Sequence, residues 1–291
     1  MISKGTQYLT AAGFGNIRVT AASMGPLDIL GTVSGWLSKA TRQAIMVAFG
    51  ADGAAVIRAT NAYLNGIAAT DPSKAQALAG FINEDPMMVC SLGLSVEGVT
   101  MPVRYATGNG SGKYFQLGIV PTEDMSMKFK VCCATTTTNR LFYVRNNFAD
   151  GSEYGFWVAS NNVISAAWGR GAATKTIVFN SDGYVTLEVN KTEAKMNGEA
   201  FALPQGTLKT TTYPFVLPAL NQSGGIYQEG HTNKIMSLEI SKTGADYFFL
   251  PIKRNGVMEL LDVWSGNLAT RTGTFTEEFT RDNQPWTPPT P

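Results

Sequence analysis

The chain has 291 residues and a formal net charge of +1, with 15% charged and 44% hydrophobic residues. This length is enough for two domains, and the near-neutral balance argues against a nucleic-acid-binding surface, which needs an excess of basic residues. The sequence holds no signal-peptide pattern and no run of about 18 apolar residues such as a membrane helix needs, so we expect a protein that folds in the cytoplasm of the cell that makes it.

Apolar residues at spacings of three and four predict short helices in the first third of the chain. The first two helices are expected over 35–49 and 53–64, and Asn65 with the following glycine is expected to end the second. A third helix is predicted to begin after Asp71, a capping residue followed by proline, and to end before Pro86.

These predicted helices carry alanine at many apolar positions, so each buries little area, worth roughly 25 cal/mol per Å2. Residues 1–30 before them are rich in Gly, Ala and Thr and predict an extended arm that becomes ordered where it docks. Two glycines and a proline within 89–104 indicate a domain boundary. We therefore expect residues 1–100 to form an attachment or oligomerisation region, stabilised by self-association, by another protein or by the following domain.

Beyond this boundary the hydrophobic period changes from helical to two. Residues 125–133 alternate between apolar and polar side chains, which predicts a half-buried antiparallel strand. Turn signals at intervals near ten residues separate further predicted strands, as in an all-β sandwich. These further strands are expected at 141–144, 154–158, 163–168, 176–179 and 184–189, with a hairpin over 193–203 that turns at Asn197-Gly198.

The three cysteines are too few and badly placed for a disulfide framework. Cys132 and Cys133 are neighbours on a predicted strand, so their side chains point to opposite faces, and Cys90 lies far upstream. We therefore expect reduced thiols, as in a protein that folds in a reducing cytoplasm. Neither a metal site nor a redox pair is expected at these positions.

The end of the chain holds its most distinctive pattern. Two apolar runs flank Arg254-Asn255-Gly256, which predicts a β-hairpin with Asn255 and Gly256 in the turn, since both residues tolerate positive φ. Residues 281–291 then contain four prolines and predict an extended tail. This tail is read either as a recognition segment or, preferably, as a solvated end.

The closing segment resembles that of the concanavalin A-like (laminin-G-like) jelly-roll domains in virion proteins of phages that infect gut bacteria. An opening match lies within 105–121, where Phe115-Gln116-Leu117 replaces the usual Ile-Asp-Thr of the family. The closing motifs occur here in the family's order: Leu250-Pro251, Arg254-Asn255-Gly256, Leu261-Asp262, Ser265-Gly266 and Gly273-Thr274-Phe275. The resemblance implies a jelly-roll β-sandwich over 104–280, so the expected protein is mainly β with a small helical N-terminal region.

The resemblance also implies a role in a virion. We expect a head or tail fibre or decoration protein, a homotrimer, whose first hundred residues bind other virion proteins. The sandwich would be displayed outward to bind a host-surface glycan, and no nucleic acid or membrane insertion is expected. Three alternatives stay open: a glycan-degrading enzyme of the same fold, a bacterial surface lectin, and an architectural decoration protein that binds no sugar.

Glycan recognition needs exposed aromatic rings beside hydrogen-bonding side chains. The candidate glycan-binding residues are Tyr154, Trp168, Arg170 and Tyr227, because Trp168 and Arg170 lie where a predicted strand meets a loop. Large aromatic residues at alternating strand positions are also typical of a core. For Trp157 the core position is preferred, whereas for Trp168 both positions stay open.

Catalytic residues are not expected. Glycoside hydrolases need two carboxylates about 5 to 10 Å apart, and in such a sandwich these usually lie two or four residues apart on one strand. Glu188 has no such partner, Glu277 and Glu278 would face opposite sides of a strand, and Asp262 lies at a hairpin position that favours local hydrogen bonding. We therefore expect a protein that is not an enzyme.

Metal ions and cofactors are not expected either. His231 is the only histidine and lies in a predicted loop, where a surface position is the simpler interpretation. Asp150 and Asp182 are conceivable calcium ligands, but their spacing does not single them out. The glycine-rich stretch 108–113 lacks the spacing and the following helix of a phosphate-binding loop and is read as a turn.

Overall fold

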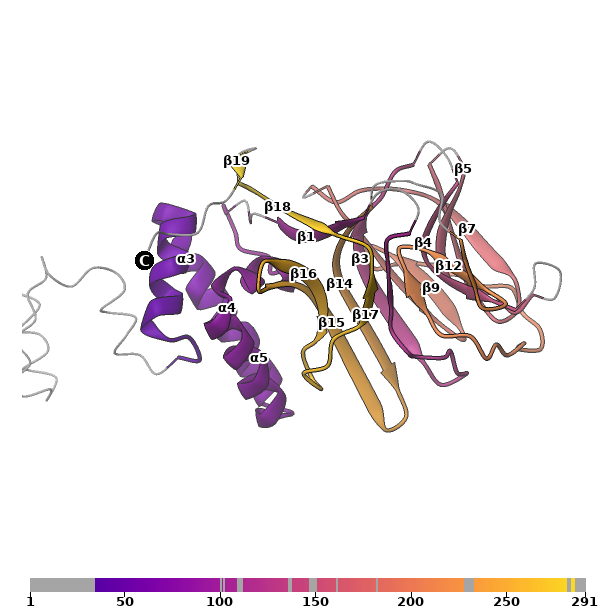
Figure 1. The fold of residues 1–291 in the computed structure, drawn as a ribbon, viewed down its shortest axis with the longest axis horizontal. Helices are drawn as coiled ribbons and strands as arrows, with labels where there is room; N and C mark the ends of the chain where they lie inside the picture. Colours follow the sequence, from indigo (N-terminus) through magenta and orange to yellow (C-terminus); the bar gives the residue numbers. More distant parts are fainter. Residues whose placement is uncertain are drawn as a thin grey trace, which may run out of the picture. The chain divides into compact units, whose positions relative to one another are not determined.

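The computed structural model describes residues 35–99, 101, 103–108, 112–135, 138–146, 151–160, 162–181, 183–227, 233–281 and 284–285. The predictions made for the N-terminal arm, Asp150, Asp182, His231 and most of the C-terminal tail lie outside these residues. The described chain divides into two compact units (Figure 1). Residues 35–89 and 94–99 belong to the first unit, and residues 90–93 and 101–285 belong to the second.

The first unit is helical. It contains α3 (Lys39–Phe49), α4 (Gly53–Ala68) and α5 (Pro72–Glu84), with a 3-10 turn η1 (Gly50–Asp52) between α3 and α4. Another 3-10 segment, η2 (Pro86–Leu92), follows α5 and runs across the division between the units. None of the helices in the described residues is both long and apolar enough to cross a membrane.

Most helix boundaries follow from local chemistry. The expected start of the first helix at residue 35 is wrong, because α3 begins at Lys39 after Ser38, whose hydroxyl accepts a hydrogen bond from the Thr41 N–H. The Asp71 carboxylate accepts hydrogen bonds from the Ser73 hydroxyl and from two backbone N–H groups in the first turn of α5, and these bonds, that of the Ser73 hydroxyl first, lower the pKa of Asp71.

The predicted end of α4 at Asn65 and Gly66 is wrong, because the Ala69 N–H still donates to the Asn65 carbonyl. Asn65 also uses its side chain, which accepts a 2.9 Å hydrogen bond from the Trp36 indole.

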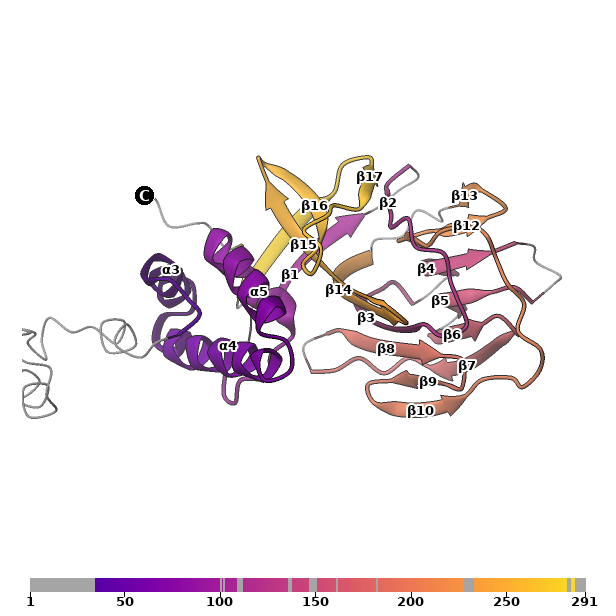
Figure 2. The same cartoon turned by 90° about the horizontal axis from the view of Figure 1, so that it is seen from below.

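The second unit is a β-sandwich in two layers (Figures 1 and 2). The larger sheet has the order β10-β9-β8-β3-β14-β1-β18-β19, and β15 pairs with β14 and β16. Its strands are β1 (Val103–Gly108), β3 (Ser126–Cys132), β8 (Val185–Asn190), β9 (Glu193–Met196), β10 (Glu199–Ala202), β14 (Asn233–Lys242), β15 (Ala245–Arg254), β16 (Val257–Asp262), β18 (Thr276–Arg281) and β19 (Gln284–Pro285).

The smaller sheet has the order β13-β12-β4-β5-β6-β7, in which β12 and β4 are parallel and the other neighbours antiparallel. Its strands are β4 (Asn139–Arg145), β5 (Tyr154–Ser160), β6 (Val163–Trp168), β7 (Ala172–Thr176), β12 (Leu220–Gln222) and β13 (Gly225–Tyr227). A short third sheet joins β11 (Val216–Leu217), β2 (Tyr114–Gln116) and β17 (Thr270–Thr272). The predicted fold class, mainly β with a helical N-terminal region and a C-terminal sandwich, is confirmed.

The core lies between the two sheets, where the apolar faces predicted from strand alternation meet. Phe129 of β3 and Phe142 of β4 contact across the layers with ring centroids 5.9 Å apart. Cys133 belongs to this core and Cys132 packs on the other face, as their adjacency predicted. Burial raises the pKa of the Cys133 thiol to about 12, so this thiol stays protonated at neutral pH.

One predicted strand is displaced. We expected a strand over 176–179, but β7 spans Ala172–Thr176 and the residues after it leave the sheet. Ile177 N–H donates to the Asn162 carbonyl, and Asn180 N–H donates to the Tyr184 carbonyl, which closes a turn. These bonds outside the sheet satisfy the backbone, so the apolar residues there do not continue the strand.

The closing hairpin β15–β16 is confirmed, with Asn255 at φ 51° and Gly256 at φ 78° in its turn. Asp262 at the end of β16 is buried, and its carboxylate accepts hydrogen bonds from Phe248 N–H, Trp264 N–H and the Ser265 hydroxyl. The Asp and Ser of the closing motif therefore hold the hairpin to the turn that follows it.

Candidate functional site

One end of the sandwich carries a pocket of about 480 Å3 that is built from loops of both sheets. The β6–β7 loop of the smaller sheet contributes Arg170, and the loops after β8 and β10 of the larger sheet contribute most of the rest. Its lining residues are Glu123, Arg170, Lys191, Thr192, Gln205, Gly206, Thr207 and Leu208. We call this the Arg170 pocket.

Arg170 is held in place by the backbone around it. It lies between Gly169 at φ 66° and Gly171 at φ 95°, so the chain turns sharply out of β6. Its Nη1 donates a 3.1 Å hydrogen bond to the Gly206 carbonyl, and its Nη2 donates to the Lys191 carbonyl. Within the described residues no carboxylate forms an ion pair with Arg170, so its charge is oriented by neutral carbonyl groups alone.

Tyr154 and Trp168 lie directly beneath this loop. Their exposed fractions are 2% and 0%, and their rings meet edge to face with centroids 5.2 Å apart. Of the two positions left open for Trp168, the structure shows the core position, and neither ring can stack on a sugar in this conformation. Aromatic residues at alternating strand positions pack into the core here, because β5 and β6 present that face to the other sheet.

These two buried rings support the pocket instead of lining it. The Tyr154 hydroxyl donates a hydrogen bond to the Lys209 carbonyl, and Lys209 N–H donates in turn to the Gly169 carbonyl at 2.6 Å. A Cβ atom at Gly169 would lie only 2.5 Å from the Tyr154 hydroxyl oxygen. The β6–β7 loop therefore rests on Tyr154 without space for a larger residue.

Charged groups of the pocket influence the pKa of the buried Tyr154. Burial raises the pKa of Tyr154, the negative charge of Glu123 raises it further, and the positive charge of Arg170 opposes both effects. Glu123 also pairs with Lys191 at 3.5 Å, with exposed fractions of 66% and 52% for the two side chains. Such an exposed ion pair contributes about 0–1 kcal/mol, so Lys191 is only weakly held.

Tyr227 does not belong to this pocket. It lies on β13, at the edge of the smaller sheet opposite β7, and it is 55% exposed. The structure thus brings three of the predicted residues together and places the fourth elsewhere. A glycan-binding role stays a prediction for Arg170 and Tyr227, the two whose side chains reach solvent.

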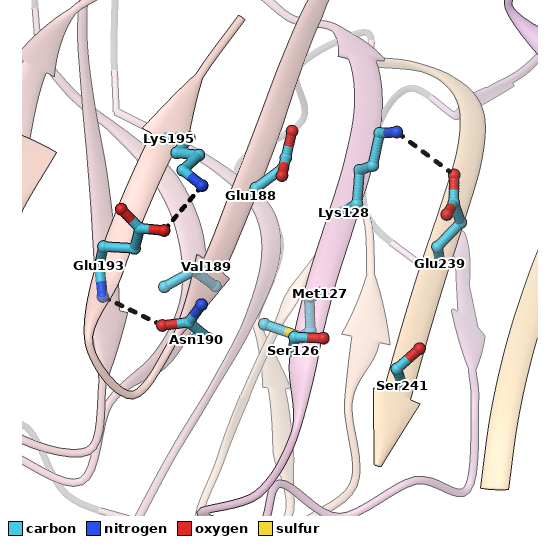
Figure 3. A pocket seen from close by; sticks show the side chains of 10 residues that line it. All are labelled: Ser126, Met127, Lys128, Glu188, Val189, Asn190, Glu193, Lys195, Glu239 and Ser241. Atoms are coloured by element: carbon cyan, nitrogen blue, oxygen red, sulfur yellow. Dashed lines mark hydrogen bonds and ion pairs between the residues drawn. The ribbon is translucent and has the colours of Figure 1, made fainter. Parts of the chain in front are cut away.

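A second hollow, of about 200 Å3, lies on the outer face of the larger sheet (Figure 3). The strand register places Lys195, Glu188, Lys128 and Glu239 side by side on β9, β8, β3 and β14. The Lys128 and Glu239 side chains are 3.8 Å apart, and Lys195 pairs with Glu193 at 2.7 Å. We call this alternation of charge the sheet-face row.

Sequence reasoning missed this row, because its acids lie on different strands. Glu188 and Glu239 flank Lys128 and are two inter-strand steps of about 4.8 Å apart. Burial raises the pKa of Glu239, the Lys128 ammonium lowers it, and the Glu188 carboxylate raises it. Only the strand register reveals this pair, since neither Glu188 nor Glu239 has another carboxylate two or four residues away on its own strand.

Metal binding finds no support in the described side chains. No group of three or more His, Cys, Asp or Glu residues in that part of the chain is arranged to hold a metal ion. The Arg170 pocket offers two cations and one carboxylate, a set suited to anions rather than to metals.

No protein-family model matches the chain. No curated protein matches it either. Among solved structures, the CBM40 of a Ruminococcus gnavus IT-sialidase is 14% identical with a TM-score of 0.35, over 47% of this chain and 90% of that one. The same CBM40 bound to alpha2,3 sialyllactose is 12% identical with a TM-score of 0.36 over the same shares.

A botulinum neurotoxin type C structure, titled for interaction with two ganglioside molecules, is 12% identical with a TM-score of 0.29. The match covers 50% of this chain and 40% of that one. Likenesses at this level assign no ligand and no activity to this chain.

Proposed function

We propose that this protein is a non-enzymatic bacteriophage virion protein, a head or tail fibre or decoration protein, whose sandwich binds a host-surface glycan. The observation that carries the glycan-binding part is the preformed Arg170 pocket at the loop end of the sandwich. The virion part is supported by the order of the closing motifs between Leu250 and Phe275.

The Arg170 pocket suits a sugar ring in size and in chemistry. Its volume of about 480 Å3 falls within the range of roughly 300–1,000 Å3 found for small-molecule sites. The hydroxyl groups of Thr192 and Thr207 and the amide of Gln205 can both donate and accept hydrogen bonds, as sugar hydroxyls do. Because Arg170 is already oriented, a ligand would pay little to order it.

The helical unit is assigned to attachment and trimer formation. Among the buried residues of α5, two of four are alanine, so this helix contributes little apolar area to a core. Val47 on α3 is 65% exposed, so one apolar side chain of this helix is open to solvent. Light scattering of the purified full chain should then give the mass of a trimer, and a monomer with one cooperative melt would contradict this assignment.

Two experiments test the proposed function. A glycan array probed with the full chain should show binding that an Arg170→Gln variant loses. Cryo-electron microscopy of phage particles that carry this gene should show density for the sandwich on the particle surface. Particles that lack the protein would refute the virion role, and a blank array with a correctly folded protein would leave an architectural decoration protein as the function.

Polysaccharide hydrolysis is a second candidate function, which the sheet-face row favours. The register sets the backbones of Glu188 and Glu239 two inter-strand steps apart, about 10 Å, which is close to the separation of about 6.5–9.5 Å between the carboxyl groups of inverting hydrolases. Lys128 lies between them and pairs with Glu239, which hinders a water molecule from reaching the space that such enzymes keep open. Turnover of a polysaccharide that a Glu239→Gln variant abolishes would establish this activity; no turnover would support the binding protein.

A further inference from the structure

Arg170 carries an oriented positive charge that no described carboxylate neutralises. Its two hydrogen-bond partners among the described residues are the carbonyls of Gly206 and Lys191, which come from different loops. Its Nε is buried and makes no hydrogen bond to that part of the chain. From this we infer that the Arg170 pocket selects a glycan residue that bears an acidic group, a carboxylate or a sulfate ester, and that Arg170 is the anchor for that group. This inference rests on the proposed glycan binding and names its ligand class.

The charge balance of the pocket favours an anion. Arg170 and Lys191 supply two positive charges, and Glu123 supplies one negative charge. Glu123 is paired with Lys191 and not with Arg170, so the surplus positive charge is on Arg170. A neutral sugar offers only hydroxyl groups, and closing such a ligand over Arg170 would remove water from an uncompensated charge, which is unfavourable.

The geometry of Arg170 also favours an oxyanion. Two carbonyl groups already hold one N–H of each terminal nitrogen, and they fix the plane of the guanidinium group. A second N–H remains on each of these nitrogens. Carboxylate and sulfate groups present paired oxygens that match such a planar fork, and hydrogen bonds of this kind are stronger than those between neutral groups.

Lys191 provides a second contact that a ligand can recruit. Its ammonium group lies 3.5 Å from the Glu123 carboxylate in an exposed pair, which exchanges readily with solvent. An acidic ligand at Arg170 would compete with Glu123 for Lys191. Thr192 and Thr207 then remain for the hydroxyl groups of the same sugar ring.

The experiment measures binding of matched glycan pairs to the full chain by isothermal titration. One pair is a disaccharide that ends in glucuronic acid and its glucose counterpart, and the other is galactose-6-sulfate and galactose. The acidic member should bind at least about tenfold more tightly, the scale of one charge-assisted hydrogen bond. The ratio of affinities within each pair holds the sugar constant, so comparing the two ratios shows whether the pocket prefers a carboxylate or a sulfate.

Variants tie the preference to this site. Arg170→Gln should remove most of the preference, and Arg170→Lys, which keeps the charge but not the planar fork, should retain only part of it. Arg58→Gln is the matched control, because it removes the same charge by the same substitution at an exposed position of α4. It should leave both affinities unchanged.

Each outcome separates the inference from the proposed function. If the acidic and neutral members bind the full chain with equal affinity, the pocket does not select an acidic group. The inference is then overturned, while glycan binding itself stands. A preference that Arg170→Gln does not alter would place the anion elsewhere and overturn the anchor. No binding of either pair and no binding on an array would overturn the proposed function together with the inference.

Discussion

Replacing Gly169 by alanine tests whether the buried Tyr154 holds the Arg170 loop in place. The new Cβ would lie 2.5 Å from the Tyr154 hydroxyl oxygen and 2.8 Å from the Lys209 carbonyl oxygen. Both distances are too short for a carbon atom, so the hydrogen bond between these two oxygens must break. Its loss at a buried donor costs about 1–3 kcal/mol, and the positive φ of 66° costs alanine about 1–2 kcal/mol more.

Gly198→Ala supplies the matched control for this change. Gly198 has φ 83° in the β9–β10 turn, and a Cβ there would meet no atom within 4 Å. This variant therefore carries the conformational cost alone. The difference between the two variants isolates the contact with Tyr154 and should be about 1–3 kcal/mol. The free energies of unfolding are measured by urea denaturation of the full chain, where a shift in the midpoint at an unchanged m value reports the change in stability.

A second substitution shows which atom causes the loss. Tyr154→Phe removes the hydroxyl that the Gly169→Ala methyl would meet, so the double variant should be more stable than additivity predicts by about 1 kcal/mol. Binding to the Arg170 pocket should weaken in Gly169→Ala, because Arg170 is the next residue. Equal costs for Gly169→Ala and Gly198→Ala, or strictly additive effects with Tyr154→Phe, would refute the reasoning.

Three further predictions follow from other contacts. Asp262→Ala leaves two backbone N–H groups without their acceptor and should lower the free energy of unfolding by about 2–4 kcal/mol in urea, whereas Asp262→Asn should cost less. Glu153→Ala removes the carboxylate that lies 3.5 Å from the buried Arg145 guanidinium, which also donates to Gln222 Oε1, and should lower the free energy of unfolding by about 3 kcal/mol; a decrease below about 1 kcal/mol would show an ion pair no stronger than an exposed one. Hydrogen bonds from the Thr122 hydroxyl and the Thr243 N–H hold the pKa of Asp124 well below its ordinary value of 3.8. Because the folded pKa is depressed, the stabilisation by Asp124 is present above pH 3.8 and is lost only as the pH falls further, so the Thr243 amide resonance in an NMR titration should move below that pH; a midpoint at 3.8 would contradict the contact.

Local chemistry predicted the elements whose signals lie within a few residues. Asp71 followed by proline predicted the start of α5, and Asn255-Gly256 predicted the β15–β16 turn. The prediction failed at Gly66, where the poor helix former lies inside α4 because the backbone hydrogen bonds continue to Ala69. Glycine in a helix interior costs about 1 kcal/mol relative to alanine, and tertiary packing readily overrides a preference of this size.

The candidate site could be predicted only in part. Arg170 was found from the sequence because it lies where β6 meets a loop between two glycines. Tyr154 and Trp168 were also selected as candidates, but the structure buries both rings in the core, since alternation does not say which face of β5 and β6 meets the core. The sheet-face row was not predicted, because Glu188 and Glu239 share a face only through the pairing of both strands with β3.

The sequence by itself determined the division into a helical and a strand-rich part, most strand positions and the tight turns, because periodicity and turn residues act over a few positions. The tertiary structure decided which side chains are buried, which loops meet at Arg170 and which charges lie side by side on the larger sheet. These outcomes depend on strand register and on contacts such as that of Tyr154 with Lys209, 55 residues away. Such long-range pairing leaves no repeating pattern in the residues near either partner.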